Sequence, residues 1–188
     1  MNSKSKRIFI ISGPSAVGKD AIVERILKTD LPLKRMVTTT SRPRRADDQR
    51  LKYHYVTADR FRWLIDHGKM IEWVQYNENY YGTQWADLDK IFALKKYPLL
   101  NIEVRGAEFY RTNFPKAISI FILPSSISIL RKRLEKRGTK ETDIRDRLKT
   151  AQKEIRQAPK FNYRVINYDG KLENVVAEVA KLIKQRIR

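Results

Sequence analysis

The sequence predicts an α/β fold in which helices flank a parallel sheet and a mixed β/α segment is inserted between parts of that sheet. Near-continuous apolar runs at 7–12, 97–104 and 117–123 are typical of strands buried on both faces. Helix-like stretches alternate with these runs, as they do around a parallel sheet. Between 35 and 97 the composition becomes rich in aromatic residues, threonine, arginine and aspartate, which indicates the insert.

The first strand and the first helix enclose a glycine-containing loop. The strand is expected over 7–12 and the helix over 19–29. The loop and the start of the helix read Gly13-Pro14-Ser15-Ala16-Val17-Gly18-Lys19-Asp20. This is the pattern GxxxxGK with a strand before it and a helix after it, which is the context that a phosphate-binding loop requires.

The chemistry of this loop suits nucleotide phosphates. Gly13 and Gly18 let backbone N–H groups turn inward on an anion, and the helix N-terminus adds the positive end of its dipole. Lys19 reaches the outer phosphates. A turn with a purely structural role would not explain this lysine, because a cation at a helix start opposes the dipole. The last position of the pattern, usually Ser or Thr, is Asp20.

The insert contains short alternating and helix-like segments. Strands are expected over 35–40, 53–56 and 71–76. Helices are expected over 58–67, which Gly68 ends, and over 85–94.

The rest of the chain returns to the alternation of a parallel sheet. Residues 127–158 form two charged helical stretches separated by Arg137-Gly138-Thr139. A short strand over 164–167 and an amphipathic helix over 172–187 follow. In such a sheet, ligands bind at the carboxyl ends of the strands.

Composition narrows the class of protein. A chain of 188 residues suits one compact domain. The absence of cysteine excludes disulfides, zinc–thiolate sites and thiol nucleophiles, and we expect a cytoplasmic protein. The first apolar stretch breaks at Gly13, too early for a signal peptide or a membrane span, so no membrane partner is expected. The net charge of +19 favours anionic ligands. Without a long basic run or a basic stripe with interleaved aromatic residues, nucleic acid is not favoured as a partner.

A second group of anion-binding side chains lies in the insert. The segment Thr38-Thr39-Thr40-Ser41-Arg42-Pro43-Arg44-Arg45 holds three arginines, whose planar guanidinium groups suit pairs of phosphate oxygens. Downstream, Asn79-Tyr80-Tyr81-Gly82-Thr83 adds phenol and hydroxyl groups beside a glycine that permits close approach.

These ordered motifs resemble the guanylate kinase family over nearly the whole chain. The resemblance begins with the GPSxxGK loop and a TTxRxxR-like segment at 39–45. The further motifs that carry it are Tyr53-His54-Tyr55-Val56, Ile71-Glu72-Trp73, Asn79-Tyr80-Tyr81-Gly82-Thr83, Phe121-Ile122-Leu123-Pro124, Arg133-Leu134-Glu135-Lys136-Arg137-Gly138 and Val165-Ile166-Asn167.

The resemblance implies a P-loop NTPase-type parallel sheet flanked by helices, with a mixed β/α insert that binds the nucleoside monophosphate and a helical lid. The core would comprise 1–34, 98–126 and 159–188, the GMP-binding insert 35–97, and the lid 127–158. The implied reaction is ATP + GMP ⇌ ADP + GDP with Mg²⁺. ATP and GMP would be the small-molecule partners, and the protein would be a monomer or a homodimer.

Site residues are carried over from the same resemblance. The implied ATP-binding residues are Gly13, Pro14, Ser15, Ala16, Val17, Gly18, Lys19, Asp20, Arg133, Arg137 and Asn167. The implied GMP-binding residues are Arg42, Arg45, Tyr53 and Tyr81 at the phosphate, and Thr38, Glu72, Thr83 and Glu103 at the guanine edge. The implied catalytic residues are Lys19, Arg42, Arg137 and Arg147. A carboxylate such as Glu72 can accept from guanine N1–H and the exocyclic amine at once, a donor pair that adenine lacks.

Three positions depart from the family pattern. Asp20 replaces the hydroxyl residue that touches Mg²⁺, Asn101 stands where an Asp is common, and Glu103 replaces a second Asp. One hypothesis links the first two, because a carboxylate gained on the loop and one lost on the strand leave the charge near the metal unchanged. Asp20 would then be a metal ligand. The alternative is that Asp20 only stabilises the first helical turn.

Other functions remain open at this point. A GKD ending also occurs in the related ribose bisphosphate phosphokinases, although a sugar phosphate offers no base edge to Glu72. A non-catalytic guanylate-kinase-like module would bind phosphopeptides, but such modules usually lose the lysine found here as Lys19. Arg131 and Arg145 are interpreted as a solvated helical face, and Trp63, Trp73 and Trp85 as core of the insert.

Overall fold

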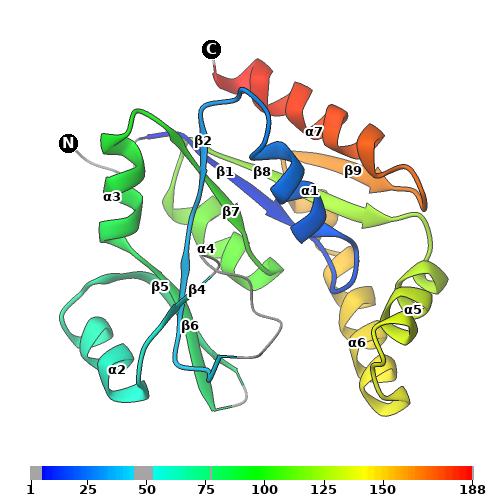
Figure 1. The fold of residues 1–188 in the computed structure, drawn as a ribbon, viewed down its shortest axis with the longest axis horizontal. Coiled ribbons are helices and arrows are strands. Elements are labelled where there is room, and N and C mark those ends of the chain that lie inside the picture. The colour runs from blue at the N-terminus through cyan, green and yellow to red at the C-terminus, as the bar shows by residue number, and fades with distance from the viewer. Residues whose placement is uncertain (1–5, 45–52, 77, 188) are drawn as a thin grey trace.

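A five-stranded parallel sheet forms the centre of the computed structural model, which describes residues 6–44, 53–76 and 78–187 (Figure 1). Its strand order is β2-β7-β1-β8-β9. The strands are β1 (Ile8–Ser12), β2 (Leu33–Arg35), β7 (Tyr97–Asn101), β8 (Ala117–Pro124) and β9 (Tyr163–Asn167). All five residues of β1 are buried, as expected for a central strand with helices on both faces. The predicted α/β fold class is confirmed.

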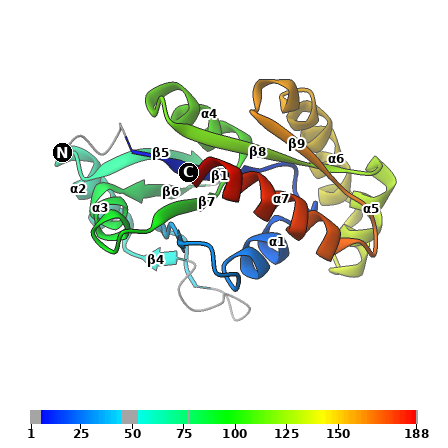
Figure 2. The same cartoon turned by 90° about the horizontal axis from the view of Figure 1, so that it is seen from above.

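Helices cover both faces of this sheet (Figures 1 and 2). Helices α1 (Lys19–Ile26) and α7 (Leu172–Ile187) lie on one face, and α4 (Val104–Asn113) lies on the other. Alternate residues of β1 point to opposite faces. Phe9 accordingly belongs to the apolar cluster beneath α1 and α7, whereas Ile10 belongs to the cluster with α4.

A second, mixed sheet holds the residues of the predicted insert. Its strand order is β4-β3-β6-β5. The strands are β3 (Thr38–Thr40), β4 (Tyr53–Tyr55), β5 (Met70–Tyr76) and β6 (Asn79–Gln84). Helix α2 (Ala58–Asp66) begins at the Thr57 side chain, which accepts from the N–H of Arg60, and is followed by Gly68 at φ +60°. Helix α3 (Trp85–Ala93) packs Leu88 and Ile91 into the same apolar cluster as α4.

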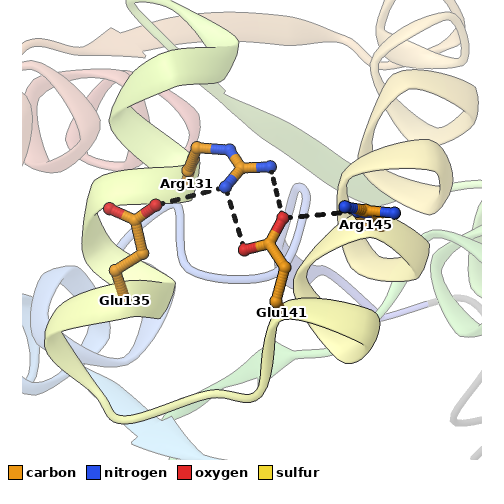
Figure 3. A network of polar contacts seen from close by, with 4 residues as sticks. All are labelled: Arg131, Glu135, Glu141 and Arg145. Carbon is orange, nitrogen blue, oxygen red and sulfur yellow. Dashed lines mark hydrogen bonds and ion pairs between the residues drawn. The ribbon is translucent and has the colours of Figure 1, made fainter.

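Two helices, α5 (Ile127–Lys136) and α6 (Glu141–Ile155), form the segment predicted as a lid, and a 3₁₀ turn at Ala158–Lys160 follows. A surface ion-pair network joins them (Figure 3). Arg131 donates to Glu141 through two nitrogens at 3.0 Å and to Glu135 at 3.2 Å, while Arg145 also donates to Glu141. Arg131 holds the pKa of Glu141 below its usual value. The interpretation as a solvated helical face is therefore wrong for Arg131, which bridges the two helices, and agrees with Arg145, which is 71% exposed and pairs within its own helix.

Two of the predicted strands are corrected by the structure. The single strand expected over 35–40 is two short strands, because the chain leaves the parallel sheet after Arg35 and enters the second sheet at Thr38. The strand expected over 97–104 ends at Asn101, and Val104 begins α4, a helix that the apolar pattern did not predict.

The interpretation of the tryptophans as core is wrong for two of the three. Trp63 is 38% exposed and Trp73 is 45% exposed. Trp63 stacks on His67 at the helix surface, and Trp73 lies on β5, which is an edge strand of its sheet. Trp85 does pack against the buried Phe114.

Candidate active site

The phosphate loop follows β1 and has the backbone that its glycines predict. Gly13 has φ +147° and Gly18 has φ +104°, and the non-glycine Ala16 is also left-handed at φ +63°. A Cβ atom on Gly13 would collide with the carbonyl oxygen of Ile122 on β8. Glycine is therefore needed at this position both for the backbone angle and for the close approach of β8.

Lys19 bends back over this loop. Its Nζ donates to the carbonyl oxygen of Gly13 at 2.5 Å and to that of Pro14 at 3.0 Å. Burial lowers the pKa of the ammonium group, and the charges of Glu154, Glu103 and Asp20 oppose that shift. Residues from α6, from the start of α4 and from α1 thus face one lysine. We conclude that three separate elements converge on the phosphate loop.

Asp20 and Asn101, two of the three departures from the family pattern, lie in contact. Asn101 Nδ2 donates to Asp20 Oδ1 at 2.7 Å, and Arg35 Nη2 lies 3.3 Å from the same oxygen. Arg35 ends β2, Asn101 ends β7 and Asp20 begins α1, so the carboxyl ends of two strands meet the loop here. The Asp20 side chain is 64% exposed. The described part of the chain contains no group of three or more His, Cys, Asp or Glu residues that could hold a metal ion.

Three of the residues predicted to bind or transfer phosphate contact the phosphate loop from β9, α5 and α6. Asn167, which ends β9, donates to the carbonyl of Val17 at 2.7 Å. Arg133 of α5 donates to the same carbonyl at 3.0 Å and pairs with Asp169 at 3.1 Å. Arg147 of α6 lies 3.5 Å from the Ser15 hydroxyl. Each of these side chains is thus within the loop's immediate surroundings.

Arg137 follows α5, is exposed, and contributes to the electrostatic environment of Lys19. Its charge adds to the lowering of the Lys19 pKa, after the larger effect of burial.

The predicted acceptor-phosphate residues lie on the second sheet. Arg42 is 9% exposed, and its guanidinium lies 5.5 Å from the Tyr53 ring centre and 5.8 Å from that of Tyr55. Its Nη1 also donates to the carbonyl of Pro43 at 2.7 Å. Aromatic faces and a carbonyl thus hold one arginine in place. Arg45 lies outside the described residues.

The predicted base-reading residues meet at β5 and β6. Thr83 Oγ1 donates to Glu72 Oε1 at 3.0 Å and forms a second hydrogen bond with the hydroxyl of Tyr110. Thr83 and Tyr110 are almost completely buried. Burial raises the pKa of Glu72 to about 7, and the hydrogen bonds from Thr83 oppose that shift.

The remaining predicted residues lie at separate positions around this group. Thr38 is half-buried on β3 and pairs with Tyr53 in the strand register. Tyr81 is half-buried on β6, opposite Thr40 on one side and Val74 on the other. Glu103 is exposed at the N-cap of α4.

The first turn of α4 connects the two groups. Glu103 faces Lys19 electrostatically, and three residues later a methyl group on Gly106 would lie 3.9 Å from Glu72 Oε2. Gly106 and Glu72 also line a cavity of about 280 Å³ between α4 and β5. Since Asn101, just before this helix, also contacts Asp20, the short segment 101–106 links the start of α1 to the carboxylate on the second sheet.

The sequence did not single out several residues that shape the site. Arg35 and Asp169 form ion pairs with predicted residues, and Glu154 faces Lys19. Tyr110 contacts Thr83 across 27 positions of sequence. Three of these four are ordinary surface charges by sequence, and the fourth is an aromatic residue in a helix. Only the fold brings them to the site.

Comparisons with known proteins identify the family of the chain. The family model described as guanylate kinase matches residues 5–186. A guanylate kinase of Prochlorococcus marinus subsp. pastoris is 36% identical over 181 residues, covering 95% of this chain and 97% of the relative. One from Bdellovibrio bacteriovorus is 37% identical over 163 residues, covering 86% and 88%.

A solved structure resembles the fold. The crystal structure of guanylate kinase from Anaplasma phagocytophilum superposes with a TM-score of 0.75 at 23% identity, covering 97% of this chain and 86% of that one. At this identity the likeness supports the fold alone. In the described part of the chain, no helix has both the length and the apolar character needed to cross a bilayer.

Proposed function

The chain belongs to the guanylate kinase family, an ATP:GMP phosphotransferase family, and we propose that the two groups of side chains described above carry that reaction. The observation that carries this proposal is the first turn of α4. Asn101, just before this turn, contacts Asp20 beside Lys19, and Gly106 within the turn lies beside Glu72, so one short segment links the proposed donor-phosphate site to the proposed base-reading site. Such fixed positioning is most of what phosphoryl transfer requires, since its loose transition state needs little covalent help.

On the donor side, the residues Gly13 to Asp20 bind the phosphates of ATP, with Arg133, Arg137 and Asn167 around them. Backbone N–H groups and the start of α1 favour negative charge, and Lys19 exchanges its two carbonyl acceptors for phosphate oxygens. Lys19, Arg42, Arg137 and Arg147 supply positive charge to the transferring group. The contact of Arg147 with Ser15 supports a place for this arginine near the loop.

On the acceptor side, Arg42, Arg45, Tyr53 and Tyr81 bind the phosphate of GMP. The packing of Arg42 against the neighbouring rings of Tyr53 and Tyr55 supports this role, because it restricts the orientation of the guanidinium. Glu72 accepts from the guanine N1–H and exocyclic amine, with Thr38, Thr83 and Glu103 completing the edge. A half-buried carboxylate left without these donors would be costly, which disfavours adenine.

Mg²⁺ fits the residues at the start of α1. The magnesium ion usually binds one or two carboxylates together with substrate phosphates and water. Asp20 offers one exposed carboxylate at the phosphate loop, and Asn101 and Arg35 orient it by contacts to Oδ1. We assign Asp20 as the protein ligand, where the ion would neutralise phosphate charge. The contact between Asp20 and Asn101 supports a link between the two departures.

We also propose the division of labour among segments. Residues 1–34, 98–126 and 159–188 form the core, 35–97 the GMP-binding insert and 127–158 the lid. The ion-pair network of Arg131 supports movement of α5 and α6 as one unit, since Glu141 joins the two helices. A lid that closes over the phosphates excludes water from the transfer. A cytoplasmic location stays a prediction from the cysteine-free composition.

The other candidate functions are less well supported. A ribose bisphosphate acceptor would leave the half-buried Glu72 without a base edge to bind. A phosphopeptide-binding module would have no use for Lys19, which here lies on the loop's own carbonyls.

An ADP-release assay with a panel of acceptors tests the proposal. We expect Mg²⁺-dependent turnover with GMP and little with AMP, UMP, CMP or ribose bisphosphate. Lys19→Met should lower kcat about 100-fold or more, as loss of a charge at the transferring group does. Lys28→Met, a surface change just after α1, is the matched control and should retain activity. Turnover with another acceptor but not GMP, or an unimpaired Lys19→Met, would overturn the assignment.

A further inference from the structure

We propose that Tyr110 is a positioning residue for base selection, which holds the carboxylate of Glu72 in place through the hydroxyl of Thr83. This inference rests on the proposed function, because it takes Glu72 and Thr83 as the residues that read the base. Tyr110 belongs to none of the motifs that identify the family in this sequence.

The core fixes the Tyr110 ring. The side chain is fully buried on α4, with its ring centre 5.0 Å from that of Phe114 and 5.7 Å from that of Phe109. Helix α4 packs against strands β1 and β8 of the large sheet and against β5 of the second sheet (Figure 1). The phenol hydroxyl therefore reaches Thr83 from a rigid support that spans both sheets.

The hydrogen bonds between these residues have a defined direction when Glu72 is ionised. A threonine hydroxyl has one proton to donate, and Thr83 directs it to Glu72 Oε1 at 3.0 Å. The bond between Thr83 and Tyr110 must then use the proton of the phenol. Burial raises the pKa of Tyr110 well above its usual value, so the phenol keeps that proton. The result is a chain of donors from Tyr110 through Thr83 to Glu72, in which each bond polarises the next.

This chain of hydrogen bonds affects how the Glu72 carboxylate is presented to a base. Because Tyr110 occupies one lone pair of the Thr83 oxygen, the threonine proton is committed to the carboxylate. Glu72 is then held in one orientation for the two guanine donors. Without the phenol proton, the Thr83 hydroxyl can turn and donate elsewhere, and the carboxylate loses part of its support. Recognition of the exocyclic amine should be the property most sensitive to this loss, because it needs both carboxylate oxygens in place.

Tyr110→Phe tests the inference, because it removes only the hydroxyl and keeps the ring in the core. We compare kcat and KM with GMP and with IMP, whose base lacks the exocyclic amine. The expected result is a GMP-to-IMP ratio of kcat/KM that falls about 3- to 10-fold, mainly through KM for GMP, which corresponds to one hydrogen bond. Tyr97→Phe is the matched control. The Tyr97 hydroxyl on β7 donates to the carbonyl of Ile187 at the end of α7, so the ratio should not change.

A double variant distinguishes an effect transmitted through these hydrogen bonds from a general effect of Tyr110 on packing. In a Thr83→Val background the path from Tyr110 to Glu72 is cut, so adding Tyr110→Phe should change the ratio no further. If Tyr110→Phe proves unfolded, Tyr110→Met takes its place, because methionine also fills the core without a hydroxyl, and the same fall in the ratio is expected.

Two results would overturn the inference: an unchanged ratio in Tyr110→Phe, whether or not activity falls equally with both substrates, or a further fall of the ratio in the double variant. Failure of the wild-type protein to phosphorylate GMP would instead refute the proposed function.

Discussion

Replacing Glu72 with glutamine should stabilise the folded protein at alkaline pH. Burial raises the pKa of the Glu72 carboxyl to about 7, from a usual value of 4.5. The folded state then binds this proton more tightly than the unfolded chain does, so the carboxyl favours folding at low pH. That contribution is lost as the pH rises from about 4.5 through 7, where the buried group must ionise.

The size of the effect follows from the shift in pKa. At about 1.4 kcal/mol per pKa unit, full ionisation costs the fold about 3 kcal/mol, of which about 2–3 kcal/mol develops between pH 5 and pH 8. Glutamine is neutral at both pH values, has the same shape and keeps an oxygen to accept from Thr83. The free energy of unfolding of Glu72→Gln, relative to wild type, should therefore be about 2–3 kcal/mol higher at pH 8 than at pH 5.

Urea denaturation of both proteins at pH 5 and pH 8 measures this difference directly. Glu108→Gln, the same chemical change on the exposed side of α4, is the control and should show little dependence on pH. If the stability difference between Glu72→Gln and wild type changes by less than about 0.5 kcal/mol from pH 5 to pH 8, the argument that burial raises the pKa of Glu72 is refuted. The same variant should lose most of its activity with GMP, because the amide cannot accept from both guanine donors.

Three further predictions concern the loop, the metal and the pH profile. In chemical denaturation, Gly13→Ala should lower the free energy of unfolding by about 2–4 kcal/mol, because the new Cβ meets the backbone of β8. The control Gly138→Ala, at φ +70° with open space around it, should cost only about 1 kcal/mol. Equal losses in the two variants would contradict the packing argument. In Mg²⁺ titrations of activity, the double variant Asp20→Ser with Asn101→Asp should be less impaired than the sum of the single variants, and strict additivity would remove the proposed link. Since Glu72 must be ionised to accept from guanine and its pKa is about 7, kcat/KM for GMP should rise about tenfold between pH 6 and pH 8, and a flat profile would contradict this role.

Local sequence patterns predicted the elements whose structure depends on neighbouring residues. The strand, the turn and the start of the helix at 8–19 were predicted correctly, because the two glycines of the turn lie within a few positions of both elements. The terminal helix was predicted with its observed bounds because its apolar positions recur at helical spacing. The break at Arg35 was not predicted, because which of two sheets a strand joins depends on pairing with Leu99 or with Tyr53, far along the chain.

In the candidate site, too, contacts between residues far apart in the sequence could not be predicted. Family motifs name Lys19 and Glu72, whereas the surroundings that shift their pKa values come from contacts over long sequence distances. Glu154 lies 135 positions after Lys19, and nothing in its helix distinguishes it from a surface charge. The exposed Trp73 illustrates the reverse error. Its size suggests the core, but its strand lies at the edge of a sheet.

The hydrogen bonds of Lys19 to its own loop bear on how tightly ATP can bind. By joining the carbonyl groups of Gly13 and Pro14, the ammonium group holds the cradle in shape as part of folding itself. The entropy of ordering the loop is then not subtracted from the affinity for the nucleotide. To bind, ATP must give the Lys19 ammonium group stronger hydrogen-bond acceptors than two peptide carbonyls. The charged oxygens of a triphosphate are such acceptors.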